Sequence, residues 1–363
     1  MILHSNSPWA KLVHFADFHR RWAGILIAVF IVIGAGSVTA AYFLQPKPAA
    51  TVITVKEEAK AVTENGVTKY YSPLTGLEVK DELETRKQIT AIMIENSLDA
   101  RPQSGIKSAG VVFEAVAEGG ITRYLTLFQE SRPGLIGPVR SVRPYYIDWM
   151  GPFQASIAHV GGSQNALLTL KNGGYKDIDQ FFNGSYYWRA TDRVAPHNVY
   201  TNFDKLDELN KKKGYVGSDI KGWPHKLDSP VAAPNAKTIH IDISSATFNV
   251  DYNYDATTNT YNRILGGKPH ADREGGQIAP KVVVAMKVPT QIGFEDGYRE
   301  QMDTSGYNQA YIFQDGTVQE AFWRKADARA PIYFYDKAGK PIAFNAGQAW
   351  ISVTAPNKSV TWQ

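Results

Sequence analysis

One stretch near the N-terminus, Trp22–Leu44, contains no charged residue and restricts most strongly what this chain can become. About 20 consecutive apolar residues cross the hydrocarbon core of a bilayer as a helix, so we expect a transmembrane helix here. An arginine pair directly before it predicts a cytoplasmic segment at 1–21 and an extracytoplasmic remainder, in a single-pass protein of the cytoplasmic membrane. Two alternatives stay open: a signal peptide cleaved near Val38 and Ala40, or a buried core helix.

Composition limits the partners of the rest of the chain. Residues 45–70 mix proline, alanine, threonine, glutamate and lysine without a sustained period, which predicts a linker. The formal net charge is +4, and the residues after the apolar run are close to neutral. A general polyanion binder needs a stronger basic excess, so nucleic acid is not expected as a partner.

The chain has no cysteine, which excludes disulfides, thiolate metal sites, a cysteine nucleophile and a lipid-modified N-terminal cysteine. It also has no glycine-rich nucleotide loop, HExxH motif or nucleophile elbow, and we expect no cofactor. The segment NRILGGKPHADREGG offers Arg263, His270, Asp272 and Glu274. Its glycines predict a solvated loop, so we expect no metal site.

From Tyr71 onward the pattern predicts an α+β fold, beginning with a mixed α/β domain at residues 71–229. Runs of β-branched and aromatic residues predict strands at 88–96, 110–116, 121–129 and 153–160. Helices are expected at 163–174, between Ser163 and Gly173, and at 202–214, with Asn202 as N-cap.

A proline- and alanine-rich segment, 228–237, predicts a hinge before an all-β, antiparallel second domain at 235–363. Strands are expected at 247–255, 260–265, 281–288, 310–323, 331–344 and 348–354, with Asp315-Gly316 as a hairpin turn. Because this pattern looks self-contained, we expect residues 235–363 to fold alone.

The segment LIGPVRSVRPYYIDW places Arg140 and Arg143 between two prolines and before an aromatic stretch. A guanidinium is costly to place there unless it meets an anion. Pro138 and Pro144 restrict the backbone and predict a rigid, non-helical turn. Asp148 is the nearest internal competitor, but we expect at least one of the two arginines to face a ligand pocket.

Other arginines occur in glycine- and proline-rich segments such as EGGITRY and WRATDRVAPHNVY. Arginine is suited to bidentate capture of phosphate or carboxylate. The sequence therefore predicts an anion pocket in the first domain, lined by Arg123, Arg140, Arg143, Arg189, Arg193 and His197. The alternative is that internal acids pair with these arginines; the candidates are Glu114, Glu118, Glu130, Asp148 and Asp192.

Proton transfer would need a general base, and Asp148, His159 and His197 are the candidates in this region. Gly161-Gly162-Ser163 precedes an expected helix and could cradle an anion, although a plain N-cap also explains Ser163. No residue is assigned a catalytic role.

Taken together, the segments EGGITRYLTLFQ, GPVRSVRPYYIDW, AHVGGSQNAL, APHNVYTN and DGTVQEAFWRKADARAPIYFYDKAGKPIAF resemble the YerB-like family of bacterial envelope lipoproteins. The resemblance covers nearly everything from Tyr71 to the end. It implies two domains and an envelope location, and it adds Asn198 to the expected ligand-binding segment. The family has no established reaction to transfer. Since this chain has no cysteine to lipidate, the apolar helix would replace the lipid anchor.

Three functions remain open. The first is an extracytoplasmic binding or scaffold protein that recognises an envelope polymer or another envelope protein through the anion pocket. The second is an enzyme, of phosphotransferase or hydrolase type, acting on a phosphorylated or glycan envelope substrate. The third is an assembly partner without a ligand site.

Overall fold

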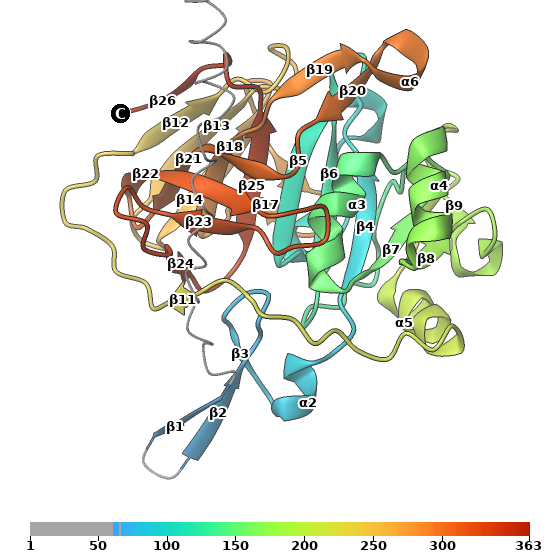
Figure 1. Cartoon of the computed structure of the whole chain (residues 1–363), viewed down its shortest axis with the longest axis horizontal. Coiled ribbons are helices and arrows are strands. Elements are labelled where there is room, and N and C mark those ends of the chain that lie inside the picture. Colours follow the sequence, from blue (N-terminus) through green and yellow to red (C-terminus); the bar gives the residue numbers. More distant parts are fainter. Residues whose placement is uncertain (1–60, 65–66) are drawn as a thin grey trace, which may run out of the picture. The chain divides into compact units, whose positions relative to one another are not determined.

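The structure, a computed structural model, describes residues 61–64 and 67–363 (Figure 1). The expected transmembrane segment, Trp22–Leu44, lies outside the described residues. Within the described part, no helix has both the length and the apolar character needed to cross a bilayer. The end of the expected linker is folded: strands β1 (Ala61–Glu64) and β2 (Val67–Tyr71) form an antiparallel hairpin, which β3 (Glu78–Val79) extends.

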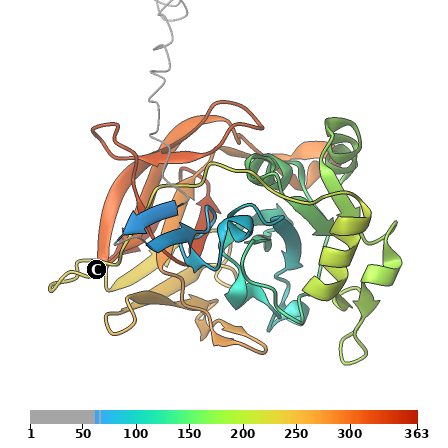
Figure 2. The ribbon, with the colours of Figure 1, turned by 90° about the horizontal axis from the view of Figure 1, so that it is seen from below.

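The largest sheet has 12 strands and draws them from both expected domains (Figures 1 and 2). Along the sheet the order is β23-β22-β21-β18-β25-β5-β6-β4-β7-β8, and β20 pairs with both β5 and β19. The bounds are β4 (Thr90–Glu95), β5 (Val111–Glu118), β6 (Ile121–Phe128), β7 (Ser156–His159), β8 (Lys176–Asp179), β18 (Val282–Lys287), β19 (Thr290–Gly293), β20 (Arg299–Met302), β21 (Gly306–Gln314), β22 (Thr317–Lys325), β23 (Tyr333–Tyr335) and β25 (Ala349–Thr354).

This sheet crosses the expected domain boundary. β25 lies between β18 and β5 and pairs with both in parallel, as the red and teal strands of Figure 1 show. The second half is mostly β, as expected, but its strands are neither all antiparallel nor a self-contained set. β18 and β25 are buried along their whole length, as is typical of strands in the middle of a parallel arrangement.

Alternate side chains of these central strands enter two different hydrophobic cores, because successive residues of a strand point to opposite faces. Val282 and Val284 of β18 pack in one core, together with Trp149, whereas Val283 packs in the other. In β25, Trp350 belongs to that second core.

A five-stranded sheet, β15-β14-β13-β12-β26, supplies the other side of the second core. Its strands are β12 (Thr238–Ile241), β13 (Val250–Asp255), β14 (Thr260–Leu265), β15 (Lys268–Pro269) and β26 (Val360–Trp362). Short pairs complete the fold: β9 (Trp188–Arg189) with β10 (Val199–Tyr200), β11 (His225–Lys226) in parallel with β24 (Phe344–Asn345), and β16 (Ala271–Asp272) with β17 (Gly276–Gln277).

The described helices are short: α2 (Glu82–Thr85), α3 (Pro144–Met150), α4 (Gln164–Gly173), α5 (Phe203–Lys212) and α6 (Phe294–Gly297). The predicted helices α4 and α5 are confirmed, and Ser163 and Asn202 cap them by accepting backbone N–H bonds. The end of α4 differs by one residue, because Gly174 and not Gly173 takes the left-handed conformation, at φ +67°.

The segment between Pro138 and Pro144 is non-helical, as expected, and helix α3 begins directly after it. Proline is tolerated in the first turn of a helix, where its missing N–H would have no partner anyway, and Pro144 begins α3. The residue before it, Arg143, is extended, as a residue before proline should be. Tyr146 and Trp149 of α3 are buried, so the aromatic stretch is a core helix.

Candidate functional site

Arg123 and Arg143 meet an internal carboxylate. Arg123 Nη2 lies 2.7 Å from Glu118 Oε1, and Arg143 Nη2 donates to Glu118 Oε2. The remaining bonds go to the backbone, since Arg123 donates to the Ser141 carbonyl at 2.7 Å and Arg143 to the Val142 carbonyl at 2.8 Å. The two arginine side chains are almost fully buried, and that of Glu118 is 26% exposed.

Electrostatics in this group favour the charged carboxylate. Burial would raise the pKa of Glu118, but the charges and hydrogen bonds of Arg123 and Arg143 outweigh that effect and lower the pKa. Two guanidinium groups therefore share one acid. The two arginines fasten the end of β5, which carries Glu118, to the segment before α3.

Arg140 belongs to a second group, centred on Glu95 at the end of β4. Its Nε lies 3.4 Å from Glu95 Oε1. The same oxygen lies 3.0 Å from His197 Nδ1 and accepts a 3.1 Å hydrogen bond from Ser97 Oγ. His197 Nε2 is on the other side of the ring, 3.9 Å from the exposed carboxylate of Asp99. The expected competitor, Asp148, is not part of this group.

The loop between β9 and β10 is held by its own polar side chains. Arg189 donates to the side-chain oxygen of Asn198 at 2.7 Å, and the Asn198 amide donates to the carbonyls of Ala190 and Arg193. The Arg193 guanidinium reaches across to the segment after β4 and donates to the carbonyls of Asp99 at 2.9 Å and Pro102 at 2.5 Å. The structure therefore assigns Arg189 and Asn198 a role in shaping the loop.

A surface pocket of about 860 Å³ lies where this loop meets the second half of the chain. Its lining includes Arg101, Arg193, Arg273 and His197, together with the acids Asp99 and Asp192. Two of these, Arg193 and His197, were expected at the site. Arg123, Arg140, Arg143 and Arg189 are not among the residues that line it.

Arg101 and Arg193 are the unusual members of the pocket, because neither makes a salt bridge within the described part of the chain. Arg101 donates to the side-chain and backbone oxygens of Asn96 and to the Thr247 carbonyl, and its guanidinium carbon lies 5.1 Å from the centre of the Phe248 ring. Burial lowers the pKa of Arg101. Arg273 differs, since it pairs with Asp192 at 2.6 Å.

The other candidate bases lie away from the pocket lining. His159 is fully buried, with Nδ1 2.7 Å from the Gly161 carbonyl and Nε2 3.0 Å from Asp177. Asp148 accepts a 2.7 Å bond from Thr304, and burial raises its pKa. The Gly161 N–H is already bound by the Asp179 carboxylate and the Ser163 N–H by the Val142 carbonyl, so these two donors are not available to an external anion.

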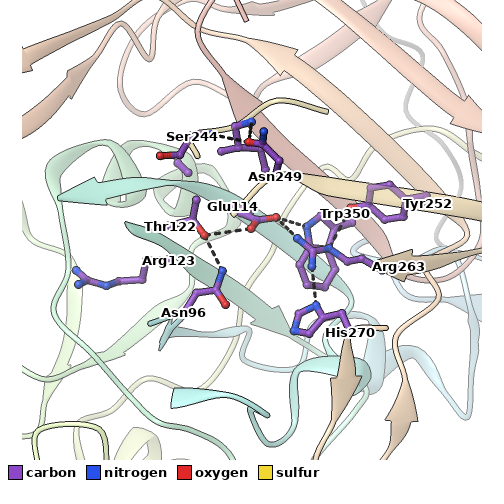
Figure 3. Close-up of polar contacts among 12 residues, drawn as sticks. Asn96, Glu114, Thr122, Arg123, Ser244, Asn249, Tyr252, Arg263, His270 and Trp350 are labelled. Atoms are coloured by element: carbon purple, nitrogen blue, oxygen red, sulfur yellow. Dashed lines mark hydrogen bonds and ion pairs between the residues drawn. The ribbon is translucent and has the colours of Figure 1, made fainter. Parts of the chain in front are cut away.

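The expectation of a solvated loop holds for Glu274, which is exposed, but is wrong for the other three residues. Arg263, His270 and Asp272 are at most 4% exposed. Arg263 Nη2 donates to Glu114 Oε2 at 2.5 Å, and both side chains are fully buried (Figure 3). The guanidinium also lies 4.3 Å from the Trp350 ring centre. Among the described residues, no group of acidic or histidine side chains is arranged to hold a metal ion.

The buried pair is part of a closed ring of hydrogen bonds between the two halves. Arg263 donates to His270 Nδ1 at 2.6 Å, and His270 Nε2 lies 3.1 Å from Gln103 Oε1. The ring then runs from Gln103 through Asn96 and Thr122 to Glu114. Burial, followed by the charges of Arg263 and Arg101, lowers the pKa of His270. His270 is therefore neutral, with its proton on Nε2.

Sequence reasoning missed this ring, although a signal was present. Glu114 is a lone acid inside the apolar strand VVFEAV, and Arg263 is a lone base in an alternating strand. A single charge in a buried strand needs a partner, but its identity depends on which distant strands become neighbours.

Comparison with known proteins agrees with this two-part organisation. Residues 74–216 match the N-terminal domain, and residues 239–351 the C-terminal domain, of a family described as protein of unknown function (DUF3048). A Bacillus subtilis (strain 168) protein named "Putative lipoprotein YerB" is 33% identical over 292 residues, which cover 78% of this chain and 86% of that protein. The crystal structure of YerB from Bacillus subtilis matches with a TM-score of 0.73 at 30% identity, over 81% of this chain and 100% of that chain. These matches confirm the resemblance seen in the sequence, and the chain belongs to the DUF3048 family of two-domain, YerB-like proteins.

Proposed function

We propose that this protein is an extracytoplasmic binding protein of the bacterial envelope whose pocket at Arg101, Arg193 and Arg273 takes an anionic group. The observation that carries the proposal is that Arg101 and Arg193 face a pocket while bonded only to neutral oxygens. Arginines elsewhere in the first half, such as Arg123 and Arg143, already have an acid. Guanidinium groups held in place by carbonyls are pre-organised for an external phosphate or carboxylate.

The location is part of the proposal. The relative YerB is named as a lipoprotein, and this chain has no cysteine for a lipid. The charge-free segment Trp22–Leu44, preceded by two arginines, would hold the described part outside the membrane instead. An envelope polymer bearing phosphate or carboxylate groups, or an acidic envelope protein, is the ligand class that fits.

The test is a calorimetric titration of the fragment Glu57–Gln363 with inorganic phosphate and, separately, with a phosphate-bearing wall polymer. Arg101→Ala and Arg193→Ala should each weaken binding by about 10- to 100-fold, the scale of a charge-assisted hydrogen bond. Arg86→Ala is the matched control, because Arg86 is 60% exposed and pairs with Glu82. Unchanged affinity in both pocket variants would contradict the proposal.

A second function, an enzyme, is favoured by one observation. His197 has Nδ1 held by Glu95 and presents Nε2 to the pocket, which is how a carboxylate orients a histidine as a general base. Ser97 contacts the same Nδ1, so it is not placed as the nucleophile that Nε2 would activate. A His197→Gln variant that binds the anion normally but no longer turns over a phosphorylated wall substrate would support this function.

A further inference from the structure

Four large apolar side chains are exposed together where α4 meets the segment after β8. Leu167, Leu168, Phe181 and Phe182 have exposed fractions of 37%, 46%, 70% and 85%. A Cβ atom at Gly161 would lie 2.8 Å from the Phe181 ring, and one at Gly162 would lie 3.2 Å from Leu167. Because these two glycines are adjacent, the helix and the loop contribute to one continuous surface.

Lysines surround this apolar surface. Lys171 follows Leu167 by four residues on α4 and therefore shares its face. On the other side, Lys205 donates to the Ser185 carbonyl at 3.1 Å, and the Lys212 ammonium lies 5.8 Å from the Tyr186 ring centre. Both contacts are with the residues that follow Phe182. Figures 1 and 2 show α4, α5 and the segment after β8 gathered at one end of the described part.

The charge balance of this region is positive. Lys211 and Lys213 at the end of α5 are also exposed, as are Lys171 and Lys212. Five acids lie on the same elements, but Asp179 is buried and accepts a backbone N–H bond and Asp207 pairs with Arg132. The three that remain, Asp177, Asp204 and Glu208, are fewer than the five lysines at 171, 205 and 211–213. Exposed phenylalanines flanked by lysines are typical of proteins that insert apolar side chains into a bilayer while their ammonium groups reach anionic headgroups.

We infer that this surface, the apolar–basic patch of Leu167, Leu168, Phe181, Phe182 and the flanking lysines, binds the surface of an anionic lipid bilayer. The choice of occupant rests on the membrane location proposed above, because the segment Trp22–Leu44 would keep the patch within reach of lipid. A second copy of the chain is a poorer occupant, since the lysines of two facing patches would repel each other. The patch and the Arg101–Arg193 pocket are separate sites.

The test uses the fragment Glu57–Gln363, which lacks the apolar run and forms its own unit. The crystallised chain of YerB matches this chain over its whole length, and the match covers 81% of this chain. The corresponding part of that relative has therefore been crystallised. Flotation is measured with vesicles of phosphatidylcholine alone and with vesicles containing 30 mol% phosphatidylglycerol. We expect binding to the second vesicle only, lost on raising the salt concentration.

Phe181→Ser/Phe182→Ser should weaken vesicle binding by about tenfold or more, because burial of a phenylalanine side chain in an apolar medium contributes a factor of this size. Lys212→Glu/Lys213→Glu should remove the preference for phosphatidylglycerol. The matched control is Leu83→Ser/Leu227→Ser, two side chains that are 82% and 88% exposed on other segments. Arg101→Ala/Arg193→Ala should bind vesicles as the unchanged fragment does, which separates this inference from the proposed function.

Three results would overturn the inference. One is that the unchanged fragment floats with neither vesicle. Another is that the pocket variant loses vesicle binding while the phenylalanine variant keeps it. The third is that sedimentation velocity shows a dimer that the phenylalanine variant abolishes, which would make the patch a contact between copies.

Discussion

Removing one partner of the buried ion pair between Glu114 and Arg263 should destabilise the whole described fold. Both side chains are 0% exposed, and their closest atoms are 2.5 Å apart. Breaking such a pair costs about 3–5 kcal/mol, because the remaining charge is left buried without its counterion. Arg263→Met also removes the guanidinium from its position 4.3 Å from the Trp350 ring centre, a contact of about 2 kcal/mol when desolvated.

Two hydrogen-bond donors to Glu114 limit the loss of unfolding free energy. In Arg263→Met, the Glu114 carboxylate still accepts from Trp350 Nε1 at 3.0 Å and from Thr122 Oγ1 at 3.2 Å. We therefore expect a net decrease of about 3–5 kcal/mol in the free energy of unfolding, which is a large part of the 5–15 kcal/mol of an ordinary domain. Glu114→Gln should cost a similar amount, because Arg263 then lacks an anion.

The assay is urea unfolding of Glu57–Gln363 and its variants, followed by fluorescence and by circular dichroism to check for a single transition. The double variant E114Q/R263M should be more stable than the sum of the single losses predicts, by at least about 2 kcal/mol. Arg86→Met, which breaks an exposed pair with Glu82, should cost less than about 0.5 kcal/mol. Strict additivity of the two buried changes would refute the argument.

The remaining predictions concern pH, the shared acid and the sheet. The pKa of His270 lies well below its ordinary 6.5, so below about pH 6.5 the unfolded chain binds a proton that the folded chain excludes. The free energy of unfolding should therefore decrease as the pH falls, by up to about 1.4 kcal/mol per pH unit. The urea midpoint should depend less steeply on pH in His270→Gln. Glu118→Gln leaves Arg123 and Arg143 without an anion. Since Glu118 is partly exposed, we expect the free energy of unfolding, measured in urea, to decrease by about 1–3 kcal/mol. This decrease should be smaller at a high phosphate concentration. Residues 235–363 alone should show no cooperative thermal transition by circular dichroism, because β25 loses its neighbour β5; a sharp transition would contradict the importance of that pairing.

Local patterns predicted the elements well. The caps at Ser163 and Asn202, and the Asp315-Gly316 turn with both residues at positive φ, follow from interactions within a few residues. The helix after Pro144 was not predicted, because proline is compatible with both a turn and the start of a helix, and packing of Trp149 against Phe113 of β5 decides between them.

Long-range partners could not be predicted in the same way. The sequence indicated that Arg140 and Arg143 need anions, and the structure supplies Glu95 and Glu118 from strands β4 and β5. Of the expected ligand residues, Arg193 and His197 line the pocket, whereas Arg273 comes from the second half of the chain. A contact between residues far apart along the chain depends on strand order, which no local pattern contains.

The central place of β25 has a consequence for biosynthesis. β5 is made early and β25 is among the last strands to be made, yet β25 lies directly beside β5 in the sheet. During synthesis, one side of β5 therefore lacks its main-chain partner until almost all of the chain printed above has been made, and an unpaired strand edge invites association with other chains. Ribosomes that stop before residue 349 release chains with an open sheet, so folding of this protein depends on translation continuing through β25.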